Sequence, residues 1–193
     1  MSDSSNKTIN DRLSNAAQSQ LLIIDVQQKL IPSVPAKVIN SVIKNINALQ
    51  DSALLLNIPT PITEQYPKGL GATSKTILDK YQSNIPITEK TSFSCCSAAE
   101  FSTNINQQRE QFILVGMESH VCVLQTALAL ISHKKTVFVV EDAICSRFKK
   151  HHHNALARMS NEGVIITNSE SVMFEWLQDA SHPHFKAVSK LIR

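Results

Sequence analysis

The sequence predicts an α/β fold: a three-layer α/β/α sandwich around a mostly parallel sheet of five to six strands, with Rossmann-like topology. Three observations predict it. The length of 193 residues suits one domain. Apolar residues make up 42% and charged residues 18% of the chain, enough to build a sizeable core. Short apolar runs alternate with helical patterns. We therefore expect a single domain over residues 1–193, with residues 1–20 as a polar N-terminal arm.

The first strand and the first helix have the clearest patterns. Residues 21–26 form a nearly continuous apolar run, which is typical of a strand buried on both faces. Pro32 and Pro35 interrupt the chain after it. Apolar residues then recur three or four positions apart, as on one face of a helix. They are Val38, Val42, Ile46, Leu49, Ala53 and Leu56.

The same alternation continues to the end of the chain. Apolar and β-branched runs predict further strands, at residues 60–64, 86–90, 112–116, 136–140 and 164–167. Helical spacing predicts helices between and after them, at residues 74–81, 97–108, 121–132, 152–161, 170–179 and 184–192. Strands that alternate with helices form right-handed crossovers, so the sheet is expected to be parallel and covered on both faces.

Composition excludes several functions. The four glycines, at positions 69, 71, 116 and 163, match neither a G-x-G-x-x-G dinucleotide turn nor a phosphate-binding P-loop. The net charge of +3 is not concentrated in a patch and aromatic residues make up only 5%, which disfavours a nucleic-acid partner. No apolar run approaches the about 18 residues of a membrane span, so we expect no membrane partner.

The N-terminus and the cysteines favour a cytoplasmic protein. The first twenty residues are polar and lack the apolar region of a secretory signal. The four cysteines, Cys95, Cys96, Cys122 and Cys145, contain no C-x-x-C pair, and a chain of this length needs no disulfide to fold. We therefore expect reduced thiols and cytoplasmic localisation.

Three reactive side chains follow predicted strands. Asp25 ends the first apolar run, Lys90 ends the strand at 86–90, and Cys122 opens the helix after the strand at 112–116. Each has an ordinary interpretation when it is considered alone: Asp25 caps a turn, Lys90 is a solvated charge, and Cys122 is an inert core thiol. Active sites of parallel sheets lie beyond the carboxyl ends of the strands, so the three are expected to converge there if these ends are neighbours.

Such a cluster would suit nucleophilic catalysis without a histidine. A helix N-terminus and a nearby lysine lower the pKa of a thiol, so we expect a lowered pKa for Cys122. Asp25 could accept the thiol proton and return it to a leaving group. Backbone N–H groups of the loop before the helix would form an oxyanion hole.

At these positions the sequence resembles the isochorismatase-like cysteine hydrolases, an α/β family that includes nicotinamidases and N-carbamoyl amide hydrolases. The resemblance covers roughly residues 15–180, and residues 64–71 are similar to the isochorismatase domain-containing subgroup. The matching segments are residues 22–27, Lys90 with residues 91–94, and residues 116–123, 141–147, 155–159 and 174–175.

The resemblance implies a catalytic triad of Asp25, Lys90 and Cys122. It also implies a cis peptide bond between Met117 and Glu118, and an oxyanion hole made by the amides of Glu118 and Cys122. The implied activity is hydrolysis of a small amide or related C–N bond in a small-molecule substrate, through a thioester on Cys122 and with no cofactor.

Two departures from the family pattern refine this expectation. Nicotinamidases carry an Asp/His metal site after the second strand, but residues 63–67 contain no histidine, so we expect no metal. Members that cleave the vinyl ether of isochorismate can lack the cysteine, so the presence of Cys122 favours acyl transfer. Vinyl-ether hydrolysis by Asp25 and Lys90 stays an alternative, as does a non-catalytic or thiol-sensing protein that retains the fold.

The substrate pocket is expected to be lined by Gln27, Tyr66, Phe93 and His120. The run of residues 151–153 consists of three histidines, which point about 100° apart on a helix and are interpreted as a polar helix start rather than a metal site. Cys95 and Cys96 are interpreted as packing or pocket residues.

The predicted helix at residues 121–132 is apolar nearly all round. A helix of this kind has little polar surface to present to solvent. We therefore expect its outer side to be covered, and a partner subunit in a homo-oligomer would cover it.

Overall fold

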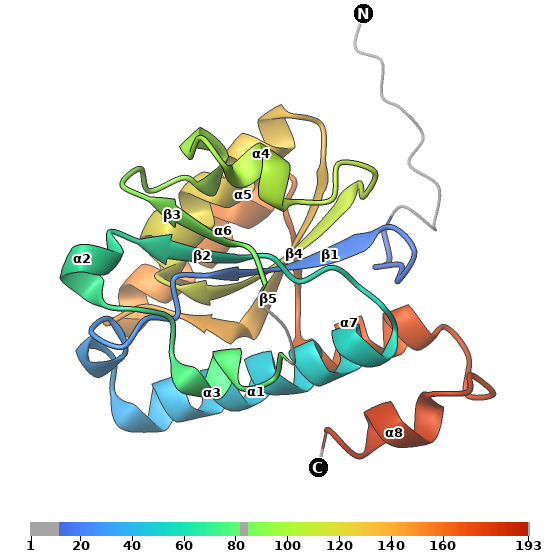
Figure 1. Ribbon diagram of the computed structural model, residues 1–193. Helices are drawn as coiled ribbons and strands as arrows, with labels where there is room; N and C mark the ends of the chain where they lie inside the picture. Colours follow the sequence, from blue (N-terminus) through green and yellow to red (C-terminus); the bar gives the residue numbers. More distant parts are fainter. Residues whose placement is uncertain (1–11, 82–84, 193) are drawn as a thin grey trace, which may run out of the picture.

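The computed structural model of the protein describes residues 12–81 and 85–192. In this part of the chain six strands form one sheet, in the order β3-β2-β1-β4-β5-β6, and every neighbouring pair is parallel (Figure 1). This order is that of the Rossmann fold, so the predicted fold class is confirmed. The strands are β1 (Ser19–Ile24), β2 (Ile62–Gln65), β3 (Ile87–Lys90), β4 (Gln111–Met117), β5 (Thr136–Cys145) and β6 (Ile165–Thr167).

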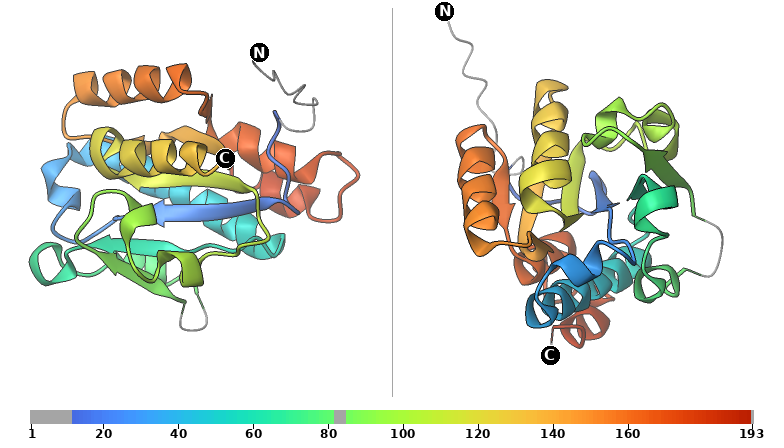
Figure 2. Two further views of the ribbon diagram at one scale, coloured as in Figure 1. Left: turned by 90° about the horizontal axis from the view of Figure 1, so that it is seen from above. Right: turned by 90° about the vertical axis from the view of Figure 1, so that its left-hand side faces the viewer.

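Helices cover both faces of the sheet and complete the three layers (Figure 2). One face carries α1 (Ala36–Leu55), α3 (Lys75–Leu78), α7 (Ser169–Leu177) and α8 (Phe185–Ser189). The opposite face carries α4 (Phe101–Asn104), α5 (Leu124–Ser132) and α6 (Lys149–Asn161). A short helix, α2 (Pro67–Leu70), follows β2. No helix in residues 12–81 and 85–192 is both long and apolar enough to span a membrane.

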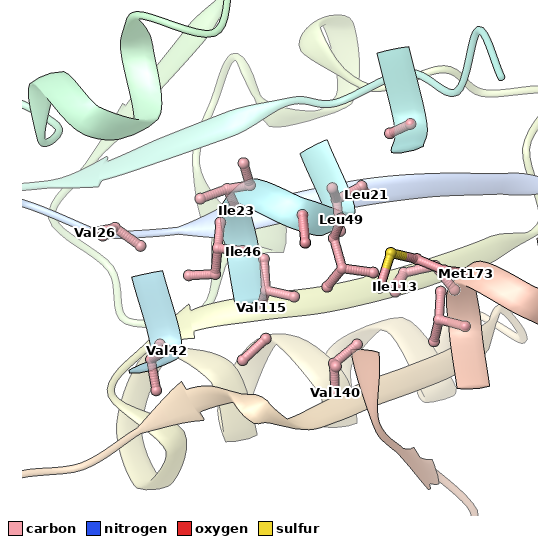
Figure 3. Packing of buried hydrophobic residues seen from close by; sticks show 14 of the residues in the cluster. Leu21, Ile23, Val26, Val42, Ile46, Leu49, Ile113, Val115, Val140 and Met173 are labelled. Carbon is pink, nitrogen blue, oxygen red and sulfur yellow. The ribbon is translucent and has the colours of Figure 1, made fainter. Parts of the chain in front are cut away.

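The core consists of two clusters separated by the sheet. Side chains of a strand alternate between its two faces. Leu21 and Ile23 of β1 therefore pack in the cluster that contains Ile46 and Leu49 of α1 (Figure 3). Leu22, between them in the sequence, belongs to the cluster on the α5 and α6 side. Both faces of β1 are buried, which explains the continuous apolar run at this position.

Several predicted boundaries were wrong. β1 begins at Ser19, inside the predicted arm, because buried Gln111 of β4 accepts a hydrogen bond from the Ser19 hydroxyl; residues 1–11 lie outside the described part of the chain. The helix predicted at 97–108 is reduced to a 3₁₀ turn, η3 (Cys95–Ser97), and the single turn of α4. Val38, predicted on the buried face of α1, is 44% exposed.

The helix predicted at 121–132 consists of a π-helical turn, η4 (Ser119–Val123), followed by α5. Much of its apolar surface is covered inside the chain, because α5 contacts η3, β5 and α6. Gln125 and Ser132 are its exposed residues, and Leu128 is half-buried. The apolar character of this helix is therefore explained largely by packing within one subunit.

Candidate active site

The carboxyl ends of β1, β3 and β4 bring Asp25, Lys90 and Cys122 together. Asp25 follows β1 with a positive φ of 53°, Lys90 is the last residue of β3, and Cys122 lies in η4 just after β4. β1 and β4 are neighbours at the point where the strand order reverses, the usual position of a site in such sheets. All three residues are buried, with exposures of 0%, 4% and 5%.

The carboxylate of Asp25 is the centre of this cluster. Its Oδ2 accepts a hydrogen bond from Lys90 Nζ at 2.7 Å, and neither side chain of this ion pair is exposed. Its Oδ1 accepts a hydrogen bond from the Thr63 hydroxyl at 2.7 Å. The charge of Asp25 also acts on the neighbouring Cys122 thiol and raises its pKa. The buried charge is thus compensated by an ammonium group and by hydrogen-bond donors, as a charge removed from water requires.

Gln65, the last residue of β2, connects Lys90 to Cys122. Its Oε1 accepts a hydrogen bond from Lys90 Nζ at 2.7 Å and lies 3.9 Å from Cys122 Sγ. Its Nε2 donates to the Thr91 carbonyl at 2.8 Å, which fixes the direction of the carboxamide. Lys90 is therefore held between a carboxylate and an amide oxygen, close to the thiol.

Gln27 does not line a pocket, contrary to the prediction. It is completely buried, and its side chain is bound to backbone groups. Its Oε1 accepts a hydrogen bond from the Gln65 N–H at 2.8 Å, and its Nε2 donates to the Gln65 carbonyl at 3.0 Å. Gln27 therefore holds the end of β2 against the loop after β1.

The turn that carries Cys122 is attached to two neighbouring segments. The Met117–Glu118 peptide bond at its start is cis. The Glu118 carboxylate accepts hydrogen bonds from the Arg147 backbone N–H and Nε at 3.1 Å each, and from Nη2 at 2.8 Å. The Ser119 hydroxyl lies 3.0 Å from His152 Nδ1 on α6. These contacts fix the turn to the end of β5 and to the first turns of α6.

Burial keeps the thiol protonated in the free protein. Burial raises the pKa of Cys122, and the charge of Asp25 raises it further, while Lys90 opposes both. The expected lowering of the Cys122 pKa was therefore wrong, because the carboxylate and the loss of water outweigh the lysine. The resting arrangement is a thiol beside a Lys90–Asp25 ion pair, so a base has to remove the proton during attack.

The predicted pocket residues Tyr66 and Phe93 lie on the rim of the site. They are 53% and 51% exposed, and they follow β2 and β3 at the same edge of the sheet. Tyr66 also lines a pocket of about 350 Å³ together with Lys90 and Thr91.

His120 is half-buried near the Cys122 thiol, but its side chain contacts other residues. Its Nδ1 lies 3.0 Å from the Ser146 hydroxyl, and its ring packs 4.7 Å from the ring of His151. Burial lowers the pKa of His120. Nothing in this arrangement makes His120 a base for Cys122.

The remaining cysteines and histidines have other surroundings. All four cysteines are free; Cys95 is completely buried, and burial raises its pKa to about 12. Cys96 is half-buried and Cys145 is buried. The histidines at 151–153 lie within α6, where His151 stacks on His120 and His152 contacts Ser119. Within residues 12–81 and 85–192, no group of three or more His, Cys, Asp or Glu side chains is arranged to hold a metal ion.

Sequence reasoning missed the roles of Thr63 and Gln65, which contact the cluster, and of Arg147, which binds Glu118 in front of the turn that carries Cys122. A signal existed for the first two, because β2 lies between the strands that carry Asp25 and Lys90, and its carboxyl end must face them. Arg147 gave no such signal, since its partner Glu118 is 29 residues away in the sequence.

Comparison with known proteins gives consistent matches. The model of the isochorismatase domain matches residues 19–171. Isochorismatase domain-containing protein 2 of Danio rerio is 35% identical over 175 residues, which cover 90% of this chain and 86% of that protein. The secreted isochorismatase effector Isc1 of Phytophthora sojae is 37% identical over 158 residues, 79% of this chain and 75% of the effector.

A solved structure described as the MAR1 ribonuclease of Caenorhabditis elegans has the same fold as this chain. It superposes with a TM-score of 0.86 and is 39% identical; the match covers 93% of this chain and 92% of that one.

Proposed function

The chain belongs to the isochorismatase family, and we propose that it hydrolyses a small amide or related C–N bond through a thioester on Cys122. The observation that carries the proposal is the buried cluster in which Lys90 Nζ binds Asp25 Oδ2 and Gln65 Oε1, and Gln65 Oε1 in turn lies 3.9 Å from Cys122 Sγ. This places a base, a cation and a nucleophile at one point.

The proposed reaction begins when Asp25 takes the proton of Cys122. The thiolate then attacks the carbonyl carbon, and the backbone amides of Glu118 and Cys122 hold the oxyanion. Asp25 returns the proton to the departing nitrogen, so the C–N bond breaks and an amine leaves a thioester on sulfur. Asp25 next removes a proton from water, which attacks the thioester and releases the acid and the free thiol.

The electrostatics of the free protein support this order of events. The raised pKa of Cys122 means that a neutral thiol waits next to a carboxylate, so the thiolate forms only as it attacks. Lys90, held by Asp25 Oδ2 and Gln65 Oε1, stabilises the negative charge that moves from carboxylate to sulfur. The arrangement needs neither a metal nor a histidine base.

Trapping of the acyl-enzyme tests the proposal. Wild-type protein and the Cys122→Ala variant are incubated with a panel of small primary amides and N-carbamoyl compounds. Intact-mass spectrometry after acid quench is expected to show an acyl adduct on Cys122 in the wild type and no turnover in the variant. Full turnover by Cys122→Ala on a genuine substrate would overturn the proposal.

The same variant separates the two alternatives. Vinyl-ether hydrolysis by Asp25 and Lys90 requires an acid and no nucleophile, so it would persist in Cys122→Ala and give no adduct. A non-catalytic or thiol-sensing protein would show neither turnover nor an acyl adduct in the wild type.

The name of the C. elegans relative raises RNA cleavage as a competing activity. We propose a small molecule instead, because the reacting groups Asp25, Lys90 and Cys122 are almost completely buried. An assay with labelled RNA decides between the two, provided that Asp25→Asn serves as the matched control. RNA cleavage lost in Asp25→Asn would contradict a small-molecule substrate.

We also propose that the protein is a cytoplasmic homo-oligomer. The exposed aromatic rings of Tyr66 and Phe93 at the rim of the site support an apolar contact there. Sedimentation velocity at micromolar concentration is expected to show a species larger than the 21.4 kDa monomer. A monomer under these conditions would refute the oligomer.

A further inference from the structure

A chain of hydrogen bonds leads away from Asp25 on the side opposite Lys90. The Thr63 hydroxyl donates to Asp25 Oδ1 at 2.7 Å, and Cys95 Sγ lies 3.7 Å from Thr63 Oγ1 with its thiol as donor. All three residues are completely buried. The proposed reaction uses neither Thr63 nor Cys95, so this buried polar chain has no role in it so far.

The members of this chain are held firmly in place. Thr63 lies on β2, paired with Ile24 at the end of β1, and its carbonyl accepts the Asp25 N–H at 3.2 Å. The Cys95 N–H donates to Thr126 Oγ1 of α5 at 3.0 Å. Hydrogen bonds therefore fix the backbone of both residues, and the contacts of the two side chains follow from these positions.

The carboxyl group that they contact changes its hydrogen-bonding character during the proposed reaction. Ionised Asp25 only accepts hydrogen bonds, whereas protonated Asp25 also donates one. Because Lys90 has donors only, it can remain on Oδ2 but cannot accept the new proton. A hydroxyl both donates and accepts, and a thiol does so weakly, so the Oδ1 side can serve both states of the carboxyl group.

We propose that Thr63 and Cys95 are positioning residues whose hydrogen-bond chain reverses its direction when Asp25 takes the proton of Cys122. Before transfer, the Cys95 thiol donates to the Thr63 hydroxyl, which donates to the carboxylate. After transfer, protonated Oδ1 donates to the Thr63 hydroxyl, which donates to Cys95 Sγ. Only O–H and S–H bonds rotate; no proton leaves the chain, so the balance of the reaction is unchanged.

This reversal provides the completely buried Asp25 with a hydrogen-bond partner in both states. A buried carboxyl O–H without an acceptor is costly, and the chain moves the unpaired donor to the S–H of Cys95, which is only a weak donor. Three titratable groups face Asp25 within the described residues: Lys90 from β3, Cys95 from η3 and Cys122 from η4. The inference rests on the proposed role of Asp25 as the base.

The test measures the alkylation of Cys122 by iodoacetamide as a function of pH, which requires no substrate. The modified Cys122 peptide is quantified by mass spectrometry, because half-buried Cys96 can react as well. Wild type is expected to show an acid limb set by Asp25. Thr63→Val keeps the shape and removes both the donor to the carboxylate and the acceptor for the protonated form. The charge-assisted bond to the carboxylate is the stronger of the two, so the acid limb is expected at higher pH, by up to about one unit. Thr63→Ser restores the hydroxyl and the wild-type limb.

Cys95→Ala gives an independent prediction of opposite sign. The chain then lacks its last acceptor only when Asp25 is protonated, so the protonated form is disfavoured and the acid limb moves to lower pH. Circular dichroism verifies that each variant is folded. Three results would overturn the inference. Thr63→Val could have the same acid limb as wild type, or Thr63→Ser the same limb as Thr63→Val. The third is a Cys95→Ala limb at higher pH than that of wild type. An unchanged profile in Asp25→Asn overturns the proposed function itself.

Discussion

Removal of Lys90 is expected to destabilise the whole protein as well as its site. The substitution Lys90→Met keeps the length of the side chain and deletes its charge, which leaves Asp25 buried without a counter-ion. Both side chains of the pair are inaccessible to solvent, and no other cation is paired with Asp25 among the described residues. The substitution therefore removes the counter-ion of Asp25 together with the hydrogen bonds from Lys90 to Asp25 and Gln65.

The distance sets the size of the effect. At 2.7 Å, two unit charges interact by about 6 kcal/mol for an effective dielectric constant of about 20. Desolvation offsets part of this attraction, and breaking a buried pair usually costs about 3–5 kcal/mol. For a chain of 193 residues, that corresponds to a fall in Tm of about 6–20 °C.

Urea unfolding of a double-mutant cycle measures this energy. Lys90→Met and Asp25→Asn are each expected to lose about 3 kcal/mol or more of unfolding free energy, and the double variant is expected to be more stable than the sum of the two losses predicts. A coupling energy below about 1 kcal/mol would refute the reasoning, because a pair worth so little resembles an exposed one.

The pH dependence of the same cycle gives a second measurement. Burial lowers the pKa of Lys90, but the negative charge of Asp25 and its hydrogen bond oppose burial, and the pKa lies above its ordinary value of 10.5. A pKa raised in the folded state means that the stabilisation is complete below the unfolded value and is lost as the pH rises through the folded value. The difference between wild type and Lys90→Met is therefore expected to shrink only above about pH 10.

Three further changes have expected outcomes. Gly116→Ala is expected to lose about 3 kcal/mol or more of unfolding free energy, because φ is +116° and a Cβ would clash with the backbone of β1. Gly163 has a φ of +87° but lies in open space, so Gly163→Ala is expected to lose only about 1 kcal/mol. Burial raises the pKa of Glu118, but hydrogen bonds and the charge of Arg147 lower it. Arg147→Gln removes the charge and the side-chain hydrogen bonds and keeps the one from the backbone N–H, so about 1 kcal/mol of unfolding free energy is lost at neutral pH. This difference disappears as the pH falls through the lowered pKa of Glu118. Leu49→Ala, in the core, is expected to cost about 2–5 kcal/mol.

Urea unfolding measures all three, and each has a matched control. Equal losses for the two glycine variants would contradict the steric explanation. A difference between Arg147→Gln and wild type that persists at acid pH would mean that Glu118 is not the partner that matters. Leu54→Ala, at a position of α1 that is 45% exposed, is expected to change stability by less than about 0.5 kcal/mol, and a larger loss would contradict the burial argument.

The sequence predicted the parts of the fold that rest on local pattern. β1 and β4 are buried on both faces, and their apolar runs made them visible. β5 extends to Cys145, beyond the predicted end. The prediction ended too early because Glu141 and Asp142 interrupt the apolar run, at the point where the register of β5 with β4 shifts. Such a shift depends on the neighbouring strand, so no pattern within one segment could reveal it.

The positions of the site residues were also predictable from the sequence, whereas the direction of the pKa shift of Cys122 was not. Strand ends located Asp25, Lys90 and Cys122, because a parallel sheet brings its carboxyl ends to one edge. The pKa of the thiol depends on the balance between burial, Asp25 and Lys90, which only the packed structure sets. Gln65 was missed because its place at the site depends on β2 lying between the strands of Asp25 and Lys90, and a glutamine draws no attention by its residue type alone.

The position of β3 at the edge of the sheet has a consequence for when the site can exist. Lys90 is 65 residues from Asp25 in the sequence, and β3 is held to the sheet by β2 alone. Short edge strands are among the first segments to open in native-state fluctuations. Each opening of β3 separates Lys90 from Asp25 while the rest of the sheet stays folded. The fraction of molecules competent for chemistry is then governed by the local opening free energy of one four-residue strand, and hydrogen exchange of its amides reports that fraction directly.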